Sequence, residues 1–176
     1  MADFQALRDS MRASLAAETL RTTGRLRLRA YGTSMLGAIW PGDVLVCERC
    51  EVEKLRLDDI VLYVRSGRLI AHRIVELSYA DGRTRVVTCG DCLPNDDPPV
   101  NLADILGRVT SVQRDGFAPR PISRRSPARR VISAVLAHSD LLCEVALRIH
   151  AAYLGLVCAL TFAAKSRNAA AVEVQG

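Results

Sequence analysis

Alternating apolar and polar positions characterise the first two thirds of the chain. Arg25-Leu26-Arg27-Leu28-Arg29 repeats with a period of two, the pattern of a strand with one solvated face. Further short runs of apolar and β-branched residues follow, at residues 44–47, 60–64, 68–77, 84–88 and 105–112. Ser66-Gly67 and Asp81-Gly82 are residue types that form tight hairpin turns. The pattern predicts a mainly β fold, a small antiparallel sheet or partly closed barrel.

Residues 3–21 have helical rather than strand periodicity. Their apolar side chains recur at roughly helical spacing, and Asp3 can cap the first turn. These apolar positions are Phe4, Leu7, Met11, Leu15 and Leu20. We expect this N-terminal helix to dock its apolar face on the domain. A partner-binding or membrane-surface helix is the alternative.

A second helical pattern runs from Val131 to about Ala164. Charged residues interrupt its first half, whereas residues 151–164 carry none. Such an uncharged helix extends only about 21 Å, against a hydrocarbon core of about 30 Å. We expect a helical tail packed on the domain or on a partner, with membrane association as the alternative. The arginines that precede it would suit anionic lipid.

These elements divide the chain into five predicted segments. They are an N-terminal helix at 1–24, a β domain at 25–116, a basic proline-rich linker at 117–130, a hydrophobic helical tail at 131–165, and a flexible C-terminus at 166–176. A hydrophobic content of 49% with 24% charged residues is typical of a packed domain and argues against extensive disorder.

Charge and the first residues bear on partners and location. The net charge of +5 permits nucleic acid or anionic lipid but demonstrates neither, and we predict no nucleic-acid partner. The N-terminal residues lack the order of a secretory signal, and no N-terminal anchor is seen. We therefore expect a membrane-associated or cytoplasmic protein with reduced thiols.

Three residues that can cooperate in acyl transfer lie in or beside the strand-like runs, two of them in the breaks between runs and His72 within the run at 68–77. They are Ser34, His72 and Asp97. A serine hydroxyl becomes a nucleophile only beside a base, and the base needs a group that fixes its tautomer. The three are therefore a candidate nucleophile, base and orienter, provided that the fold brings them together.

The sequence around these residues contains a larger set of motifs. In chain order they are Gly32-Thr33-Ser34-Met35, Pro41-Gly42-Asp43, Asp58-Asp59-Ile60-Val61, Ala71-His72-Arg73-Ile74-Val75, Gly90-Asp91 with Asp96-Asp97, and Ile105-Leu106-Gly107-Arg108-Val109. As an ordered set, they resemble the motifs of type I signal peptidases. Bacterial members have lysine where His72 stands, so the resemblance is to the Ser-His branch of archaea, some Gram-positive bacteria and the endoplasmic reticulum. It covers residues 25 to about 116.

The resemblance implies a fold and a reaction. It implies the β fold of signal peptidases, with Ser34 as nucleophile, its amide in the oxyanion site, and His72 as general base. Asp97 matches the orienting acid, Asp96 is its runner-up, and Asp91 matches a supporting acid. The implied activity is that of a serine endopeptidase that needs no cofactor and cleaves signal or leader peptides bound in extended form, with small residues before the cut.

The chain also departs from the family pattern. Leu36-Gly37 follows Met35, where the family usually has proline two residues after the methionine. Cys92 replaces an asparagine, and hydrophobic sequence lies at the carboxyl end rather than in an amino-terminal anchor. This layout favours a peptidase that processes leader peptides from the cytoplasmic side.

Two cysteine pairs give a competing interpretation. Cys47-x-x-Cys50 and Cys89-x-x-Cys92 have the spacing of a tetrahedral zinc site, which would make the chain a non-catalytic, zinc-stabilised binding module. Thiols without metal, or a redox-labile pair, are the other interpretations of these residues. An inactive peptidase relative and a self-cleaving repressor-type relative complete the alternatives.

Overall fold

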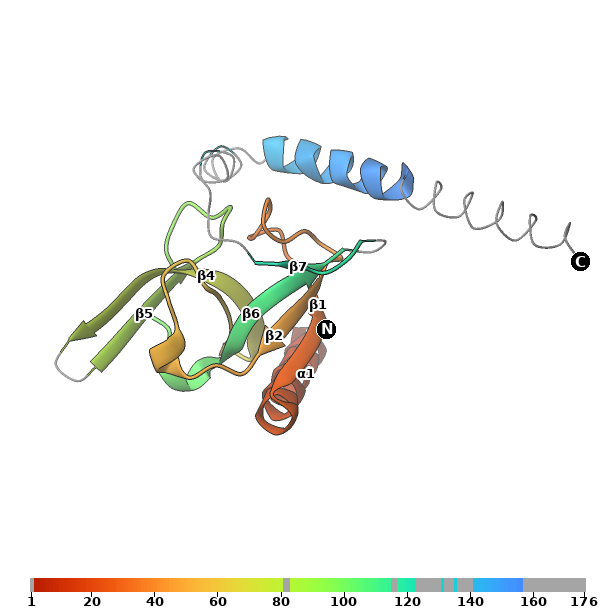
Figure 1. The fold of residues 1–176 in the computed structure, drawn as a ribbon. Coiled ribbons are helices and arrows are strands. Elements are labelled where there is room, and N and C mark those ends of the chain that lie inside the picture. Colours follow the sequence, from red (N-terminus) through yellow and green to blue (C-terminus); the bar gives the residue numbers. More distant parts are fainter. Residues whose placement is uncertain are drawn as a thin grey trace, which may run out of the picture.

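The structure is a computed structural model that describes residues 2–80, 83–114, 117–122, 131, 135 and 141–156. The chain is mainly β, with a helix near each end (Figure 1). The predicted Asp81-Gly82 turn, most of the predicted linker, and the predicted flexible C-terminus at 166–176 lie outside these residues.

A seven-stranded antiparallel sheet forms the body of the protein. Its strands are β1 (Arg25–Arg29), β2 (Val44–Glu48), β3 (Ile60–Arg65), β4 (Arg68–Ala80), β5 (Arg83–Cys89), β6 (Ile105–Gln113) and β7 (Arg120–Pro121). The order is β1-β2-β6-β3-β4-β5, and β7 pairs with β6. Six of these strands coincide with the predicted runs, whereas β7 falls in the predicted linker.

The sheet is open rather than barrel-like. Across the described residues, β1 and β5 end the strand order and do not pair with each other, so of the two predicted alternatives the antiparallel sheet is confirmed and the barrel is not. Two short 3₁₀ helices, η1 (Val52–Lys54) and η2 (Leu102–Asp104), connect the strands.

Helix α1 (Ala2–Thr23) packs against β1, β4 and β6. Gly24 terminates the helix in the left-handed conformation that glycine adopts without strain, with φ +72°. Its N–H donates to the carbonyl of Leu20 at 3.1 Å. The helix was predicted correctly, but its buried face was not. Ala13, Ala16 and Leu20 are buried.

The rest of the predicted apolar face of α1 points to solvent. Its exposed members are Phe4, Leu7, Met11 and Leu15. Small alanine side chains let the helix backbone lie close to the strands, so alanines rather than the larger residues face the sheet.

Hydrophobic residues cover both faces of the central strands. In β3, Ile60 and Leu62 belong to one core cluster, whereas Val61 and Tyr63 belong to the other. This division follows from the two-residue period of a strand, which sends successive side chains to opposite faces. Tyr63 is thereby placed on the face that also carries His72, because His72 pairs with Val61 two residues away.

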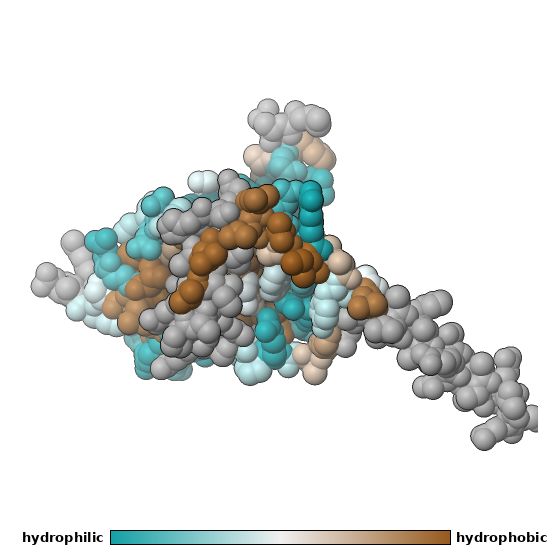
Figure 2. All heavy atoms as spheres, turned by 90° about the horizontal axis from the view of Figure 1, so that it is seen from above, coloured by the Kyte–Doolittle hydropathy of each residue, from teal (hydrophilic) through white to brown (hydrophobic). Residues whose placement is uncertain are grey.

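Residues 141–156 form a helix above the sheet (Figure 1). His150 stacks on Trp40 with ring centroids 4.2 Å apart, and Tyr153 lies 6.4 Å from Phe117. Apolar side chains gather on the upper surface of the molecule (Figure 2). Those of this helix that are exposed are Leu141, Leu142, Val145, Ile149, Tyr153 and Leu156. Among the described helices, none combines the length and apolar character needed to cross a bilayer.

Candidate active site

Ser34 lies in a tight turn between β1 and β2. Backbone bonds hold this turn, with Leu36 N–H donating to the Thr33 carbonyl at 3.2 Å and Ile39 N–H to the Met35 carbonyl at 2.8 Å. Leu36 is fully buried, which anchors the turn in the protein interior. Gly37, at the departure from the family pattern, has φ +88°, a conformation that glycine adopts without strain.

His72 and Asp97 come from different parts of the sheet. His72 lies on β4, opposite Val61 of β3, and is 6% exposed. Asp97 lies in the loop after β5, where its N–H donates to the Thr88 carbonyl at 2.8 Å. That bond folds the loop back along β5 and directs Asp97 towards β4.

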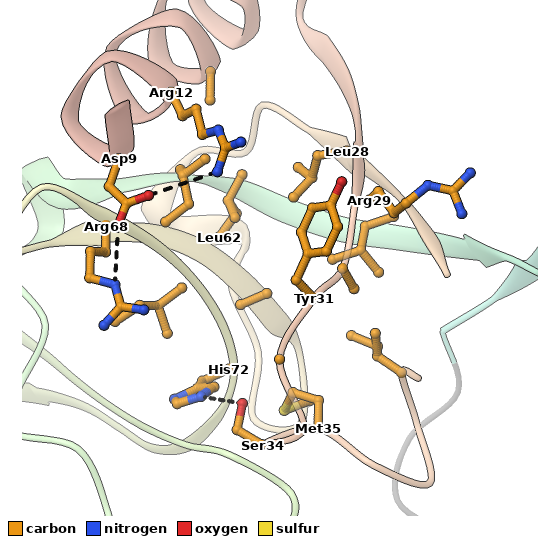
Figure 3. A pocket seen from close by; sticks show the side chains of 18 of the residues that line it. Asp9, Arg12, Leu28, Arg29, Tyr31, Ser34, Met35, Leu62, Arg68 and His72 are labelled. Carbon is orange, nitrogen blue, oxygen red and sulfur yellow. Dashed lines mark hydrogen bonds and ion pairs between the residues drawn. The ribbon is translucent and has the colours of Figure 1, made fainter. Parts of the chain in front are cut away.

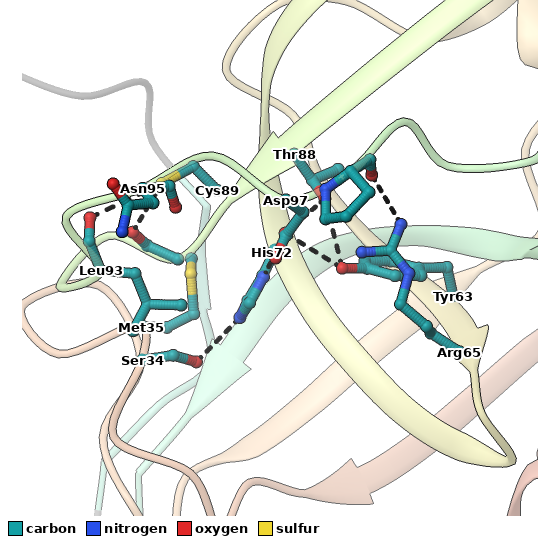
Figure 4. Close-up of polar contacts among 12 residues, drawn as sticks. Ser34, Met35, Tyr63, Arg65, His72, Thr88, Cys89, Leu93, Asn95 and Asp97 are labelled. Atoms are coloured by element: carbon teal, nitrogen blue, oxygen red, sulfur yellow. Dashed lines mark hydrogen bonds and ion pairs between the residues drawn. The ribbon is translucent and has the colours of Figure 1, made fainter.

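The structure brings Ser34, His72 and Asp97 into one hydrogen-bonded chain (Figure 4). Ser34 Oγ lies 3.0 Å from His72 Nε2, and His72 Nδ1 lies 2.7 Å from Asp97 Oδ2. An ionised carboxylate only accepts, so the network assigns the imidazole proton to Nδ1 and leaves the Nε2 lone pair for the serine hydroxyl. Both distances lie within the range of about 2.6–3.2 Å that proton transfer requires.

Two further hydroxyl groups surround the carboxylate of Asp97. Thr88 donates to Asp97 Oδ2 at 2.7 Å and Tyr63 donates to the same oxygen at 3.1 Å. Burial alone would raise the pKa of Asp97, but the hydrogen bonds from His72, Thr88 and Tyr63 together lower it below its usual value. The acid therefore stays ionised beside the imidazole.

Tyr63 and Thr88 were not among the predicted site residues. Tyrosine and threonine are ordinary strand formers, so their type carried no signal. The position of Tyr63 did offer one, because it is a polar residue in an otherwise apolar run, whereas the strand of Thr88 contains other polar residues. Burial without contact to water raises the pKa of Tyr63 to about 12, so its phenol stays protonated as a donor.

Asp91 lies beneath the site and binds Arg73. Arg73 Nε and Nη2 donate to the two Asp91 oxygens at 2.9 Å each, and these side chains are 1% and 3% exposed. Arg73 also donates to the Asp58 carbonyl at 2.8 Å. Asp91, which was predicted to be a supporting acid, thus forms a buried ion pair with Arg73. Asp96 is exposed, and the carboxylate at His72 is that of Asp97.

The acid loop and the serine turn are joined directly. Cys92 N–H donates to the Ser34 carbonyl at 2.8 Å. A Cβ at Gly90 would lie 2.9 Å from that same carbonyl oxygen and 2.9 Å from Leu93, so only glycine fits. The contact fixes Ser34 relative to the loop that carries Asp97.

A cleft of about 800 Å³ opens onto Ser34 and His72 (Figure 3). Its walls come from α1, β1 and the first residues of β4. Apolar side chains line it next to Ser34, among them Met35, Leu62 and Ala71, whereas α1 and the start of β4 contribute charged ones. The cleft is large enough for several residues of a peptide.

The four cysteines of the predicted zinc site do not converge. Cys47 is fully buried in the core, where burial raises the pKa of its thiol to about 12. The Cys92 thiol donates to the Leu36 carbonyl at 3.4 Å, and that of Cys89 to the Asn95 carbonyl at 3.3 Å. No cluster of three or more His, Cys, Asp or Glu side chains in the described chain is placed to hold a metal ion. The arrangement of these side chains in the described residues therefore gives no support to the alternative of a four-cysteine zinc site.

Chemically, the arrangement is a hydroxyl that contacts an imidazole, which is held by an ionised carboxylate at the end of a cleft. The oxyanion role of the Ser34 amide stays a prediction. No protein-family model matches the chain, and no curated protein matches it. An assignment of function therefore rests on the residues and their geometry.

Proposed function

We propose that this protein is a serine endopeptidase of the type I signal peptidase kind, in the Ser-His branch, that cleaves signal or leader peptides. The observation that carries the proposal is the continuous hydrogen-bonded path from Ser34 Oγ through His72 to Asp97. The ordered motifs around these residues support the same family.

In the proposed reaction, His72 Nε2 takes the proton of Ser34 as Oγ attacks the scissile carbonyl carbon. Asp97 stabilises the resulting imidazolium through the bond at Nδ1. The Ser34 N–H would stabilise the oxyanion of the tetrahedral intermediate. Collapse breaks the peptide C–N bond, His72 returns the proton to the leaving amine, and water then hydrolyses the acyl ester with His72 as base.

The backbone of β4 supports an extended peptide as substrate. On one edge, β4 pairs with β3 over Arg68–Arg73, whereas on the other edge β5 pairs only with Arg73–Ala80. Within the described part of the chain, residues 68–72 therefore have an edge that no strand covers. All five line the cleft, as expected if their backbone faces it. A peptide added to this edge would reach His72 and Ser34.

Of the two locations that the sequence predicts, membrane-associated or cytoplasmic, we propose membrane association through the helical tail. The exposed aliphatic side chains of helix 141–156 support this, because helical spacing puts them on one side of the helix, whereas His150 and Tyr153 contact the domain. A helix of this kind can lie in the interface of a bilayer.

The test is cleavage of peptides with small residues before the cut, followed by mass spectrometry. Ser34→Ala and His72→Ala should each lower kcat by at least about 10⁴-fold, because the nucleophile and its base act as one unit and the loss of either removes most of the catalytic effect of both. Ser10→Ala, an exposed serine of α1, is the matched control and should cleave like the wild type. Undiminished cleavage by Ser34→Ala would contradict the proposal. A wild-type protein that binds but never cleaves would favour an inactive relative.

A further inference from the structure

A charged cluster stands at the far end of the cleft from Ser34 (Figure 3). Asp9 of α1 lies 3.8 Å from Arg12 and 3.7 Å from Arg68, which begins β4. These distances are ion-pair contacts that are too long for good hydrogen bonds. The Asp9 side chain is 19% exposed, whereas those of Arg12 and Arg68 are 56% and 74% exposed.

The cluster therefore offers positive charge to the cleft. Two guanidinium groups share one carboxylate that is largely covered, which leaves one positive charge in excess. Their exposed N–H groups match the geometry of a second carboxylate, which arginine binds in a bidentate manner. Asp9 holds the two arginines near each other, and its own oxygen also accepts from Gln5 at 3.2 Å.

Strand geometry relates this cluster to the reacting atoms. Arg68 precedes His72 by four residues on β4, and strand residues rise about 3.3 Å each, so the two are about 13 Å apart along the strand. A peptide that extends along the uncovered edge of β4 advances at the same rate. Its residue about four positions from the scissile bond therefore reaches Arg68.

We propose that Arg68 and Arg12 select substrates with an acidic side chain about four residues from the scissile bond. This inference rests on the proposed function, since it places the substrate on β4. The predicted substrate is an extended peptide with small or apolar residues beside Ser34 and a glutamate or aspartate at the α1 end of the cleft. Arg68 and Arg12 would act by binding, without taking part in bond cleavage.

The experiment compares three peptides that differ only at this position, with Glu, Gln or Lys. For the wild type we expect kcat/KM to fall about two- to fivefold from Glu to Gln and further to Lys, mainly through KM, because the contact is as strong in the bound substrate as in the transition state. The difference should shrink at high salt, since the arginines are exposed. Arg68→Glu should reverse the order, so that the Lys peptide becomes the best.

Two controls separate the inference from the proposed function. Arg85→Glu changes an exposed arginine of β5, paired with Glu76 away from the cleft, and should keep the wild-type preference. Binding of the same peptides to Ser34→Ala, measured by fluorescence anisotropy, reads the charge preference without catalysis. Equal cleavage of all three peptides would overturn the inference and leave the peptidase assignment standing. Glu-selective binding with no cleavage would overturn the peptidase assignment and retain the charge selection, and no preference in either assay would overturn the inference.

Discussion

The buried pair of Arg73 and Asp91 makes a prediction that does not depend on any substrate. Both side chains are almost inaccessible, and their two bonds of 2.9 Å join the strand of His72 to the loop that contacts Ser34. Removing one partner of such a pair leaves an uncompensated buried charge, which costs about 3–5 kcal/mol. We therefore expect Asp91→Ala to lower the free energy of unfolding by that amount.

That loss is large against the total of about 5–15 kcal/mol for a domain. At about 2–4 °C per kcal/mol for a chain of this size, the melting temperature should fall by about 6–20 °C. The assay is urea unfolding followed by circular dichroism. Glu76→Ala is the matched control, because it breaks an exposed ion pair and should change stability by less than about 1 kcal/mol.

The double variant Arg73→Met with Asp91→Leu tests the reasoning. It removes both charges and should be more stable than the sum of the single variants by at least about 2 kcal/mol. Recovery should be incomplete, because the Asp58 carbonyl loses its donor from Arg73. A cost below about 1 kcal/mol for Asp91→Ala, or strict additivity in the double variant, would refute the argument.

Three further predictions follow from other contacts. Asp97→Asn should lower kcat about 10⁴-fold. Because folding lowers the pKa of Asp97, the wild type should exceed this variant in free energy of unfolding by the full amount above about pH 4, and the difference should disappear as the pH falls through the lowered pKa. A difference in urea unfolding that does not depend on pH would contradict this. Gly107→Ala should cost about 1–3 kcal/mol because its Cβ would lie 2.5 Å from a β2 carbonyl oxygen, whereas Gly155→Ala, with open space around it, should not destabilise the protein in the same unfolding assay. Burial lowers the pKa of His150, so the helix that it docks should loosen as the pH falls below about 6.5, and the fluorescence of Trp40, the single tryptophan, should follow; no change with pH, or the same change in His150→Ala, would count against it.

The strands could be predicted because they are short runs of apolar and β-branched residues bounded by turn residues, with an alternation of period two in β1. The buried face of α1 could not, since Ala13 and Ala16 carry little hydrophobic signal and Phe4 and Leu7 carry much. The openness of the sheet depends on which strands pair over long range, and composition does not record this. Strand β7 begins beside a proline and pairs over two residues only, so local pattern favours a linker there.

The candidate site shows the same limit. Ser34, His72 and Asp97 could be named from short motifs, but their contact depends on the register of β3 with β4 and on the turn after β5. Tyr63 and Thr88 could be identified only from the fold, because their contact with Asp97 depends on the side of the sheet that they face. The cysteine spacing suggested a zinc site, but spacing along a chain does not show which side chains are buried, and Cys47 is buried in the core.

The uncovered edge of β4 has a consequence for self-association. An exposed strand edge is a template on which another chain, including a second copy of this protein, can add a strand. Natural sheets protect such edges with charged side chains, and Arg68 stands at the start of this one with most of its guanidinium in water. A charged side chain at an exposed edge disfavours the addition of an apolar strand from another copy, so the same arginine that we expect to recruit an acidic peptide would also make this edge a poorer template for self-association.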